Sequence, residues 1–150
     1  GIIRVIDESY NANPASMRAA IAVLAGAEPR SDGRRVAVLG DMRELGDNSA
    51  RLHAELAEPL LAAAVDAVFL TGPEIRPLLD TIAGQADAQW LPDLDALGRA
   101  LAVYLRPGDV VMFKASNGIG LSRLVDAMVE PRTKSSTRQE AAPRVPAPEA

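Results

Sequence analysis

Short apolar runs along the chain alternate with longer segments in which apolar residues recur every three or four positions. The short runs occupy residues 2–6, 35–39, 66–70, 88–91 and 110–113. Runs of this length, rich in Val, Ile and Leu, are typical of strands. The run at 110–113 is the most apolar, and the short run at 88–91 is a candidate for a strand at the edge of a sheet.

Each strand-like run is followed by a segment in which apolar side chains fall on one face of a helix. The positions on these faces are Met17, Ala20, Ile21 and Leu24; Leu52, Leu56, Leu60 and Ala63; Ile75, Leu78, Leu79 and Ile82; Leu94, Leu97, Leu101 and Leu105; and Leu121, Leu124, Val125 and Met128. Pro14 suits the first turn of a helix, and Gly26 suits its end. Pro59 is expected to kink or split the second helix.

Alternating strands and helices predict an α/β fold, a Rossmann-like and mostly parallel sheet with helices on both faces. Right-handed crossovers then bring the carboxyl ends of all strands to one edge, where such sheets bind ligands. Polar segments follow three of the predicted strands, at residues 7–14, 40–46 and 114–118. We therefore expect these three segments to converge on one rim of the sheet.

Each polar residue of these segments also has a purely structural explanation. Asp7 could accept hydrogen bonds within its own loop, and Asn13 could cap the helix that follows it. The pair Gly40-Asp41 could form an ordinary turn, and Lys114 could be a surface charge. Lys114 nevertheless follows four apolar strand residues, and it is the only lysine before residue 131. His53 is expected to be structural or solvent-facing rather than catalytic, and Trp90 and Phe113 to serve packing.

The composition narrows the possible function classes. A net charge of −4 argues against a nucleic-acid partner. No cysteine is present, and the single histidine cannot form a multi-histidine metal site. The sequence also has no signal peptide and no apolar run long enough to span a membrane, so the cytoplasm is the expected compartment.

The two ends of the chain carry their own expectations. The sequence starts at Gly1 without a methionine and enters a strand almost at once, which suggests a piece of a longer protein. Residues 131–150 are rich in Pro, Ser, Thr and Ala, which predicts a disordered tail after a domain at residues 1–130. The chain has no phosphate-binding loop of the G-x-x-x-x-G-K-[ST] type and no G-x-G-x-x-G after its first strand.

Two of the three polar segments carry a specific resemblance. Residues 7–17 read D-E-S-Y-N-A-N-P-A-S-M, and residues 38–46 read V-L-G-D-M-R-E-L-G with His53 after them. Both resemble segments of the Mur ligase family, in the branch that adds D-alanyl-D-alanine. Residues 114–117, K-A-S-N, resemble the K-G-S strand end of that branch. If the glycine there has a positive φ, Ala115 would cost about 1 kcal/mol.

The resemblance implies a fold and an activity. Mur ligases use ATP to phosphorylate a carboxylate of the UDP-MurNAc-peptide, and an amine then attacks the acyl phosphate. They have three domains, and this chain resembles the C-terminal one, which closes over ATP and helps to bind the incoming D-Ala-D-Ala. Phosphate-loop and magnesium ligands belong to the central domain, so the resemblance implies no catalytic and no metal-binding residue in this chain, which alone would be inactive.

The resemblance also assigns residues to two ligands. Asp7 would bind the ribose hydroxyls of ATP, with Tyr10, Asn11 and Asn13 beside the nucleotide. The second group, Asp41, Lys114, Ser116 and Asn117, would face D-Ala-D-Ala or the peptide end of UDP-MurNAc-tripeptide. The alternative is a free-standing nucleotide-binding or regulatory module of Rossmann type.

Overall fold

The computed structural model describes residues 2–9, 11–30 and 32–129. Tyr10 and the tail expected at 131–150 lie outside the described residues. The strands are β1 (Arg4–Glu8), β2 (Arg35–Gly40), β3 (Ala67–Thr71), β4 (Asp87–Leu91) and β5 (Val110–Lys114). They form one sheet in the order β1-β5-β2-β3-β4, and every neighbouring pair is parallel. This confirms the expected fold class, with β4 at an edge.

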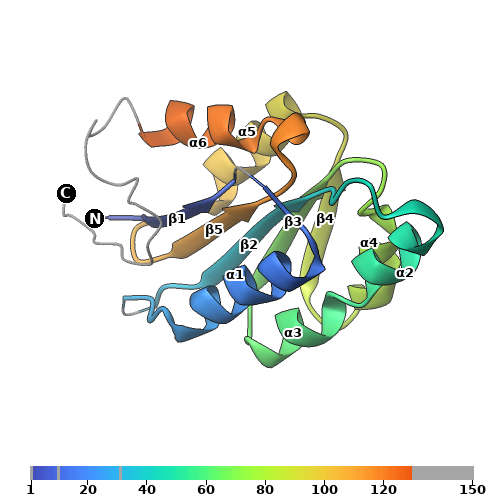
Figure 1. Ribbon diagram of the computed structural model, residues 1–150. Helices are drawn as coiled ribbons and strands as arrows, with labels where there is room; N and C mark the ends of the chain where they lie inside the picture. Colours follow the sequence, from blue (N-terminus) through green and yellow to red (C-terminus); the bar gives the residue numbers. More distant parts are fainter. Residues whose placement is uncertain (1, 10, 31, 130–150) are drawn as a thin grey trace.

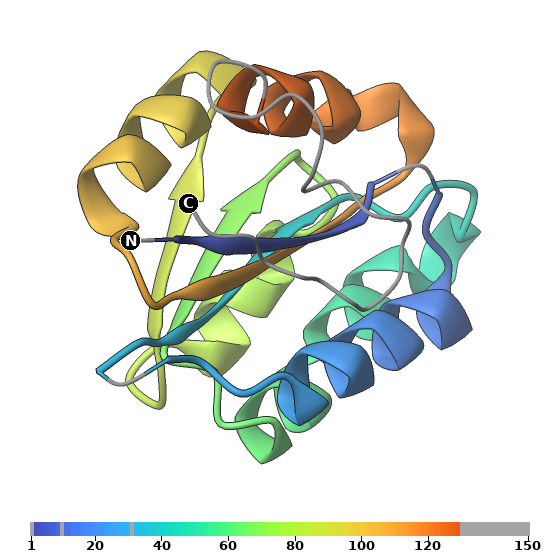
Figure 2. The same ribbon diagram turned by 90° about the vertical axis from the view of Figure 1, so that its left-hand side faces the viewer.

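Helices cover both faces of the sheet, as expected (Figures 1 and 2). The helices are α1 (Pro14–Gly26), α2 (Ser49–Ala54), α3 (Ala57–Ala62), α4 (Arg76–Ile82), α5 (Leu94–Tyr104) and α6 (Leu121–Val129). Short 3₁₀ turns, η1 (Gly46–Asn48) and η2 (Asn117–Ile119), precede α2 and α6. Figure 1 shows α1, α2, α3 and α4 on one face and α5 and α6 on the other.

One strand boundary differs from the hydrophobic pattern, whereas the second helix follows the prediction made from Pro59. The first strand begins at Arg4 rather than at residue 2, because Arg4 is the first residue in register with β5. The second helix is split in two, as Pro59 predicted. Proline has no N–H to donate to the Glu55 carbonyl, and its ring crowds that carbonyl, so the chain turns between α2 and α3.

Two apolar layers result from the alternation of side chains along the strands. In β2, Ala37 and Leu39 belong to the layer under α1, α3 and α4, whereas Val36 and Val38 belong to the layer under α5 and α6. All five residues of β5 are buried, which agrees with its interior place in the sheet, between β1 and β2. None of the helices in the described ranges is long and apolar enough to cross a membrane.

Candidate functional site at the carboxyl edge of the sheet

The predicted convergence of polar segments is present in the strand register. Lys114, the last residue of β5, is paired with Glu8 of β1 on one side and with Leu39 of β2 on the other. Beyond the strands, the Ser116 amide donates to the Asp41 carbonyl over 2.9 Å. The loops after β1, β5 and β2 therefore meet at one edge of the sheet, on the right of Figure 1.

Alternation along β1 separates two of the predicted site residues. Val5 packs in the layer under α5 and α6, and Ile6 packs in the layer under α1. By the same period of two, Asp7 belongs to the α5–α6 face, whereas Glu8 shares the α1 face with Lys114, its register partner. Asp7 and Lys114 thus start from opposite faces of the same edge.

The Asp7 carboxylate is involved in its own loop. Its Oδ1 accepts from the Ser9 amide at 3.0 Å and from the Ser9 hydroxyl at 2.5 Å. This is the local turn that the structural explanation for Asp7 anticipated. The turn orients the carboxylate at the end of β1, and the side chain is only half-buried.

Asn13 caps α1, as its structural explanation also anticipated. Its side-chain oxygen accepts from the Ser16 amide at 2.8 Å, while the Ser16 hydroxyl accepts from the Asn13 amide at 2.9 Å. This reciprocal pair is a capping box, which satisfies two helix-terminal donors at once. The Asn11 side-chain oxygen accepts from the amide of the next residue, Ala12, at 2.9 Å. Both asparagines are exposed.

Lys114 is not a surface charge. Only 3% of it is exposed, although it ends the strand at the candidate ligand edge. Burial lowers the pKa of Lys114 because an ammonium group loses hydration there, and the nearby Glu8 carboxylate offsets this in part. A buried cation has lost part of its hydration, so the binding of an anionic ligand beside it would be favourable.

Asp41 is likewise buried, with 4% exposed. Its Oδ1 accepts from the Ile75 amide at 2.9 Å, and its carboxylate lies where a side chain on Gly72 would stand. Gly72 has a φ of +110°, so its lack of Cβ serves both the backbone turn and this contact. Burial raises the pKa of Asp41, and hydrogen bonds from the Glu74 and Ile75 amides oppose that rise.

His53 is completely buried beneath the loop that follows β2, residues 41–45, which we call the Asp41 loop. Its Nε2 accepts from the Met42 amide at 2.9 Å, and its Nδ1 lies 2.8 Å from the Ser49 carbonyl oxygen. The Ser49 hydroxyl in turn donates to Glu74 Oε1 over 2.5 Å. The structural expectation for His53 is therefore confirmed, and its position links α2 to the end of β2.

Two glycine contacts at this edge were missed by the sequence reasoning. A Cβ on Gly40 would lie 2.8 Å from the Ala115 Cβ, so these two positions share one space. A Cβ on Gly118 would lie 2.8 Å from the Arg43 guanidinium carbon, so Arg43 rests on a bare glycine backbone. The spacing of Gly40 and Gly118 in the motifs was visible, but their partners depend on which loops meet.

Ser116 and Ala115 follow Lys114 at the same edge of the sheet. Ser116 is buried, and its carbonyl accepts from the Ile119 amide at 3.0 Å, which starts η2 at Asn117. Ala115 is not among the described non-glycine residues with a positive φ, so its replacement of the family glycine costs no backbone strain. Across the described ranges, no group of three or more histidines or carboxylates could hold a metal ion.

Known proteins with similar sequences belong to the family that the polar segments resemble. Residues 1–117 match the family model described as "Mur ligase, glutamate ligase domain". The UDP-N-acetylmuramoyl-tripeptide–D-alanyl-D-alanine ligase of Mycobacterium tuberculosis is 37% identical over 91% of this chain. The ligase of the same name from Synechocystis is 37% identical over 83% of this chain. The alignments cover 30% and 27% of those two relatives, so the chain spans about a third of their length.

Solved structures give the same picture. The MurF ligase from Thermotoga maritima in complex with ADP superposes with a TM-score of 0.70 and 29% identity. That match covers 87% of this chain and 30% of the Thermotoga chain. MurF from Acinetobacter baumannii superposes with a TM-score of 0.65 and 28% identity, covering 81% of this chain and 26% of that one.

Proposed function

Because the chain belongs to the Mur ligase family, as its C-terminal domain, we propose that it serves the ligase that joins D-Ala-D-Ala to UDP-MurNAc-tripeptide. In this proposal residues 1–130 form the domain that closes over ATP, and the N-terminal and central domains are its partners. The reaction takes place in the cytoplasm. The observation that carries the proposal is Lys114, a buried cation at the carboxyl edge of a sheet whose three rim segments resemble those of this branch.

The nucleotide side of the site is built on the loop after β1. The Asp7 carboxylate, oriented by Ser9, would accept hydrogen bonds from the ribose hydroxyls. Tyr10, Asn11 and Asn13 would lie beside the nucleotide. ATP supplies the phosphoryl group that activates the substrate carboxylate. Magnesium and the phosphates would be held mainly by the central domain, which carries the phosphate loop.

The acceptor side of the site is built on the loops after β5 and β2. Lys114 would pair with the carboxylate of D-Ala-D-Ala, since a charge-assisted hydrogen bond would offset its burial. Ser116 and Asn117 follow it, with Asn117 as the first residue of η2, and would contact the same peptide end. The Asp41 loop would face the substrate, with the Asp41 carboxylate ordering the loop from within.

Kinetics of the whole ligase tests the nucleotide assignment. Asp7→Ala should raise the Michaelis constant for ATP more than that for D-Ala-D-Ala. Asp7→Asn is the matched variant, because asparagine can make the same turn bonds to Ser9 but lacks the charge. Wild-type kinetics in Asp7→Asn would contradict the ribose role and would show that Asp7 only stabilises its own loop.

The alternative of a free-standing nucleotide-binding module is tested on the chain by itself. The complete set of β-α units should give a cooperative thermal transition in circular dichroism. Calorimetric titration with ATP should then show weak binding at best, and no ATP hydrolysis, because nothing in the sequence forms a phosphate-binding loop. Micromolar affinity for ATP would favour the alternative instead.

A further inference from the structure

His53 is the buried titratable group that the proposed function does not use. Both of its ring nitrogens contact the backbone: Nε2 faces the Met42 amide at 2.9 Å, and Nδ1 faces the Ser49 carbonyl at 2.8 Å. An amide can only donate and a carbonyl can only accept. Only one form of the ring satisfies both, the neutral tautomer with its proton on Nδ1.

This imidazole closes a ring of hydrogen bonds under the site. From His53 the ring passes to Ser49, whose hydroxyl donates to Glu74 over 2.5 Å. The residue after Glu74, Ile75, donates its amide to Asp41 Oδ1 over 2.9 Å. Asp41 is bonded in sequence to Met42, which donates to His53. The ring joins the ends of β2 and β3 to α2, three elements far apart in the chain.

The ring also reaches the third loop of the site. The Asp41 carbonyl accepts from the Ser116 amide at 2.9 Å, and Ser116 lies two residues after Lys114. Met42 as a whole residue is only 1% exposed, so water cannot easily replace the imidazole as an acceptor for the Met42 amide. Loss of that acceptor would leave a buried donor unsatisfied and would favour movement of the Asp41 loop.

We propose that His53 is a positioning residue. It holds the Asp41 loop against Ser116 through the Met42 amide, and so fixes the part of the carboxyl edge that is proposed to bind D-Ala-D-Ala. It touches no reacting atom in this scheme. The proposal rests on the proposed function for its kinetic consequence only. Its structural part concerns the tautomer and the Met42 hydrogen bond, and both can be measured on this chain without any substrate.

The structural part is tested by NMR on the full chain. His53 is the single histidine of the sequence, so its ring signals need no assignment. Long-range ¹H–¹⁵N spectra at neutral pH should show the proton on Nδ1 and an unprotonated Nε2. The Met42 amide should exchange slowly with solvent. A ring protonated on Nε2, or a fast-exchanging Met42 amide, would overturn the proposal whatever the reaction of the whole protein.

The kinetic part is tested in the whole ligase with a matched pair of variants. His53→Leu fills the buried space with an apolar side chain and removes the acceptor, and should raise the Michaelis constant for D-Ala-D-Ala about tenfold. In His53→Gln the side-chain oxygen can replace Nε2, and this variant should stay within about threefold of wild type. The Michaelis constant for ATP should change less than about twofold in both.

Arg51→Leu is the control on the same helix, because Arg51 is exposed and pairs only with Glu55 among the described residues. It should leave both constants at their wild-type values. Equal losses in the Leu and Gln variants, or equal effects on ATP and dipeptide, would show that His53 only supports packing. A wild-type ligase that does not use D-Ala-D-Ala would instead contradict the proposed function and leave the NMR result intact.

Discussion

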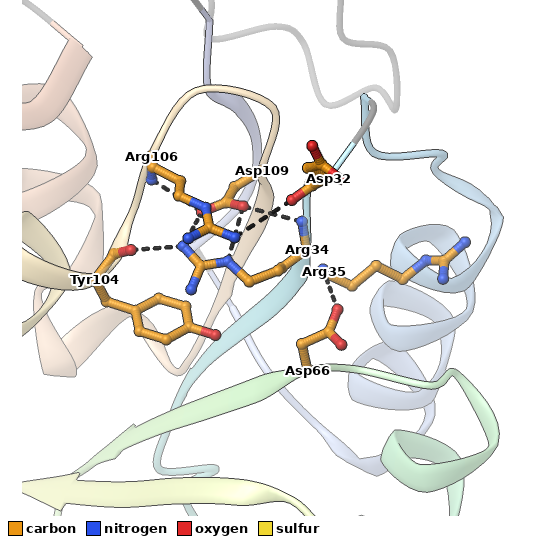
Figure 3. Close-up of polar contacts among 7 residues, drawn as sticks. All are labelled: Asp32, Arg34, Arg35, Asp66, Tyr104, Arg106 and Asp109. Atoms are coloured by element: carbon orange, nitrogen blue, oxygen red, sulfur yellow. Dashed lines mark hydrogen bonds and ion pairs between the residues drawn. The ribbon is translucent and has the colours of Figure 1, made fainter.

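Buried charges differ between the amino edge of the sheet, where the strands begin, and the carboxyl edge, where they end. At the amino edge, Asp109 is fully buried and accepts from the Arg34 amide, from the Arg34 guanidinium and from the Arg106 amide (Figure 3). The Arg34 guanidinium also stacks on Tyr104, with its carbon 3.8 Å from the ring centre. The hydrogen bond to Asp109 raises the pKa of Arg34, so the ion pair is stable as a pair of charges.

At the carboxyl edge, burial works against the charges. It lowers the pKa of Lys114 and raises the pKa of Asp41, so each group is pushed toward its neutral form. The Arg34–Asp109 pair at the amino edge therefore stabilises the fold, whereas the buried Lys114 and Asp41 at the carboxyl edge carry an electrostatic cost that a ligand can reduce.

The largest expected effect of a single substitution lies at the amino edge. Asp109→Ala should lower the free energy of unfolding by about 3 kcal/mol or more, because it leaves the Arg34 guanidinium and the amides of Arg34 and Arg106 without their acceptor. Urea denaturation of the chain measures this. Arg51→Ala, which breaks an exposed ion pair, is the control and should cost less than about 0.5 kcal/mol. Equal losses in the two variants would remove the proposed difference between the edges.

Lys114→Met should differ from Asp109→Ala, because it should reduce activity while it increases the free energy of unfolding. Methionine keeps the apolar stem and removes the charge. In the whole ligase, loss of a charge-assisted hydrogen bond of about 1.5–3 kcal/mol should reduce the efficiency with D-Ala-D-Ala about 10- to 150-fold. ATP dependence should change much less. Both parameters within about twofold of wild type, in a folded variant, would contradict the substrate role of Lys114.

The stability gain from Lys114→Met has a defined pH dependence. The folded-state pKa of Lys114 is lowered from the ordinary lysine value of 10.5, so the unfolded chain binds this proton more tightly than the folded chain. The cost of the buried ammonium is then complete below the folded-state pKa and disappears as the pH rises toward 10.5. Thermal melts should show the variant ahead of wild type at pH 7, with the gap closing at high pH. A gap that widens with pH would contradict this cause.

The fold and the location of the site could be predicted from the sequence because both depend on short-range patterns. Alternating apolar runs and helical faces fix the order of elements, and parallel crossovers gather the strand ends at one edge. The strand carrying Lys114 could be recognised as an interior strand because it is the most apolar. The split at Pro59 followed from the chemistry of one residue.

The contacts across loops could not be predicted in the same way. That His53 accepts from Met42, and that Asp41 accepts from Ile75, depends on the distance between segments up to 34 residues apart in sequence. The amino-edge ion pair of Arg34 and Asp109 spans 75 residues and left no local pattern. Such pairs need the register of the sheet before they can be inferred.

Gly40 and Ala115 allow a test of whether the carboxyl edge is packed as tightly as the core. Gly40→Ala would place its Cβ 2.8 Å from the Ala115 Cβ and should lower the free energy of unfolding by about 1–3 kcal/mol. The double variant Gly40→Ala with Ala115→Gly exchanges the two methyl groups and should recover most of that loss. Additive losses in a double-mutant cycle would show that the two positions do not share this space.

The smallest effect concerns Asn13, where a cap and a proposed ligand contact can be separated. Asn13→Ala removes the acceptor for the Ser16 amide and should cost about 1 kcal/mol in the free energy of unfolding. Asn13→Asp keeps the cap and should retain wild-type stability, because a carboxylate suits a helix N-terminus. In the whole ligase, however, the added negative charge beside the nucleotide, which is itself an anion, should raise the Michaelis constant for ATP. If Asn13→Asp shows wild-type kinetics as well as wild-type stability, Asn13 serves only as a cap, and the nucleotide role falls to its neighbours.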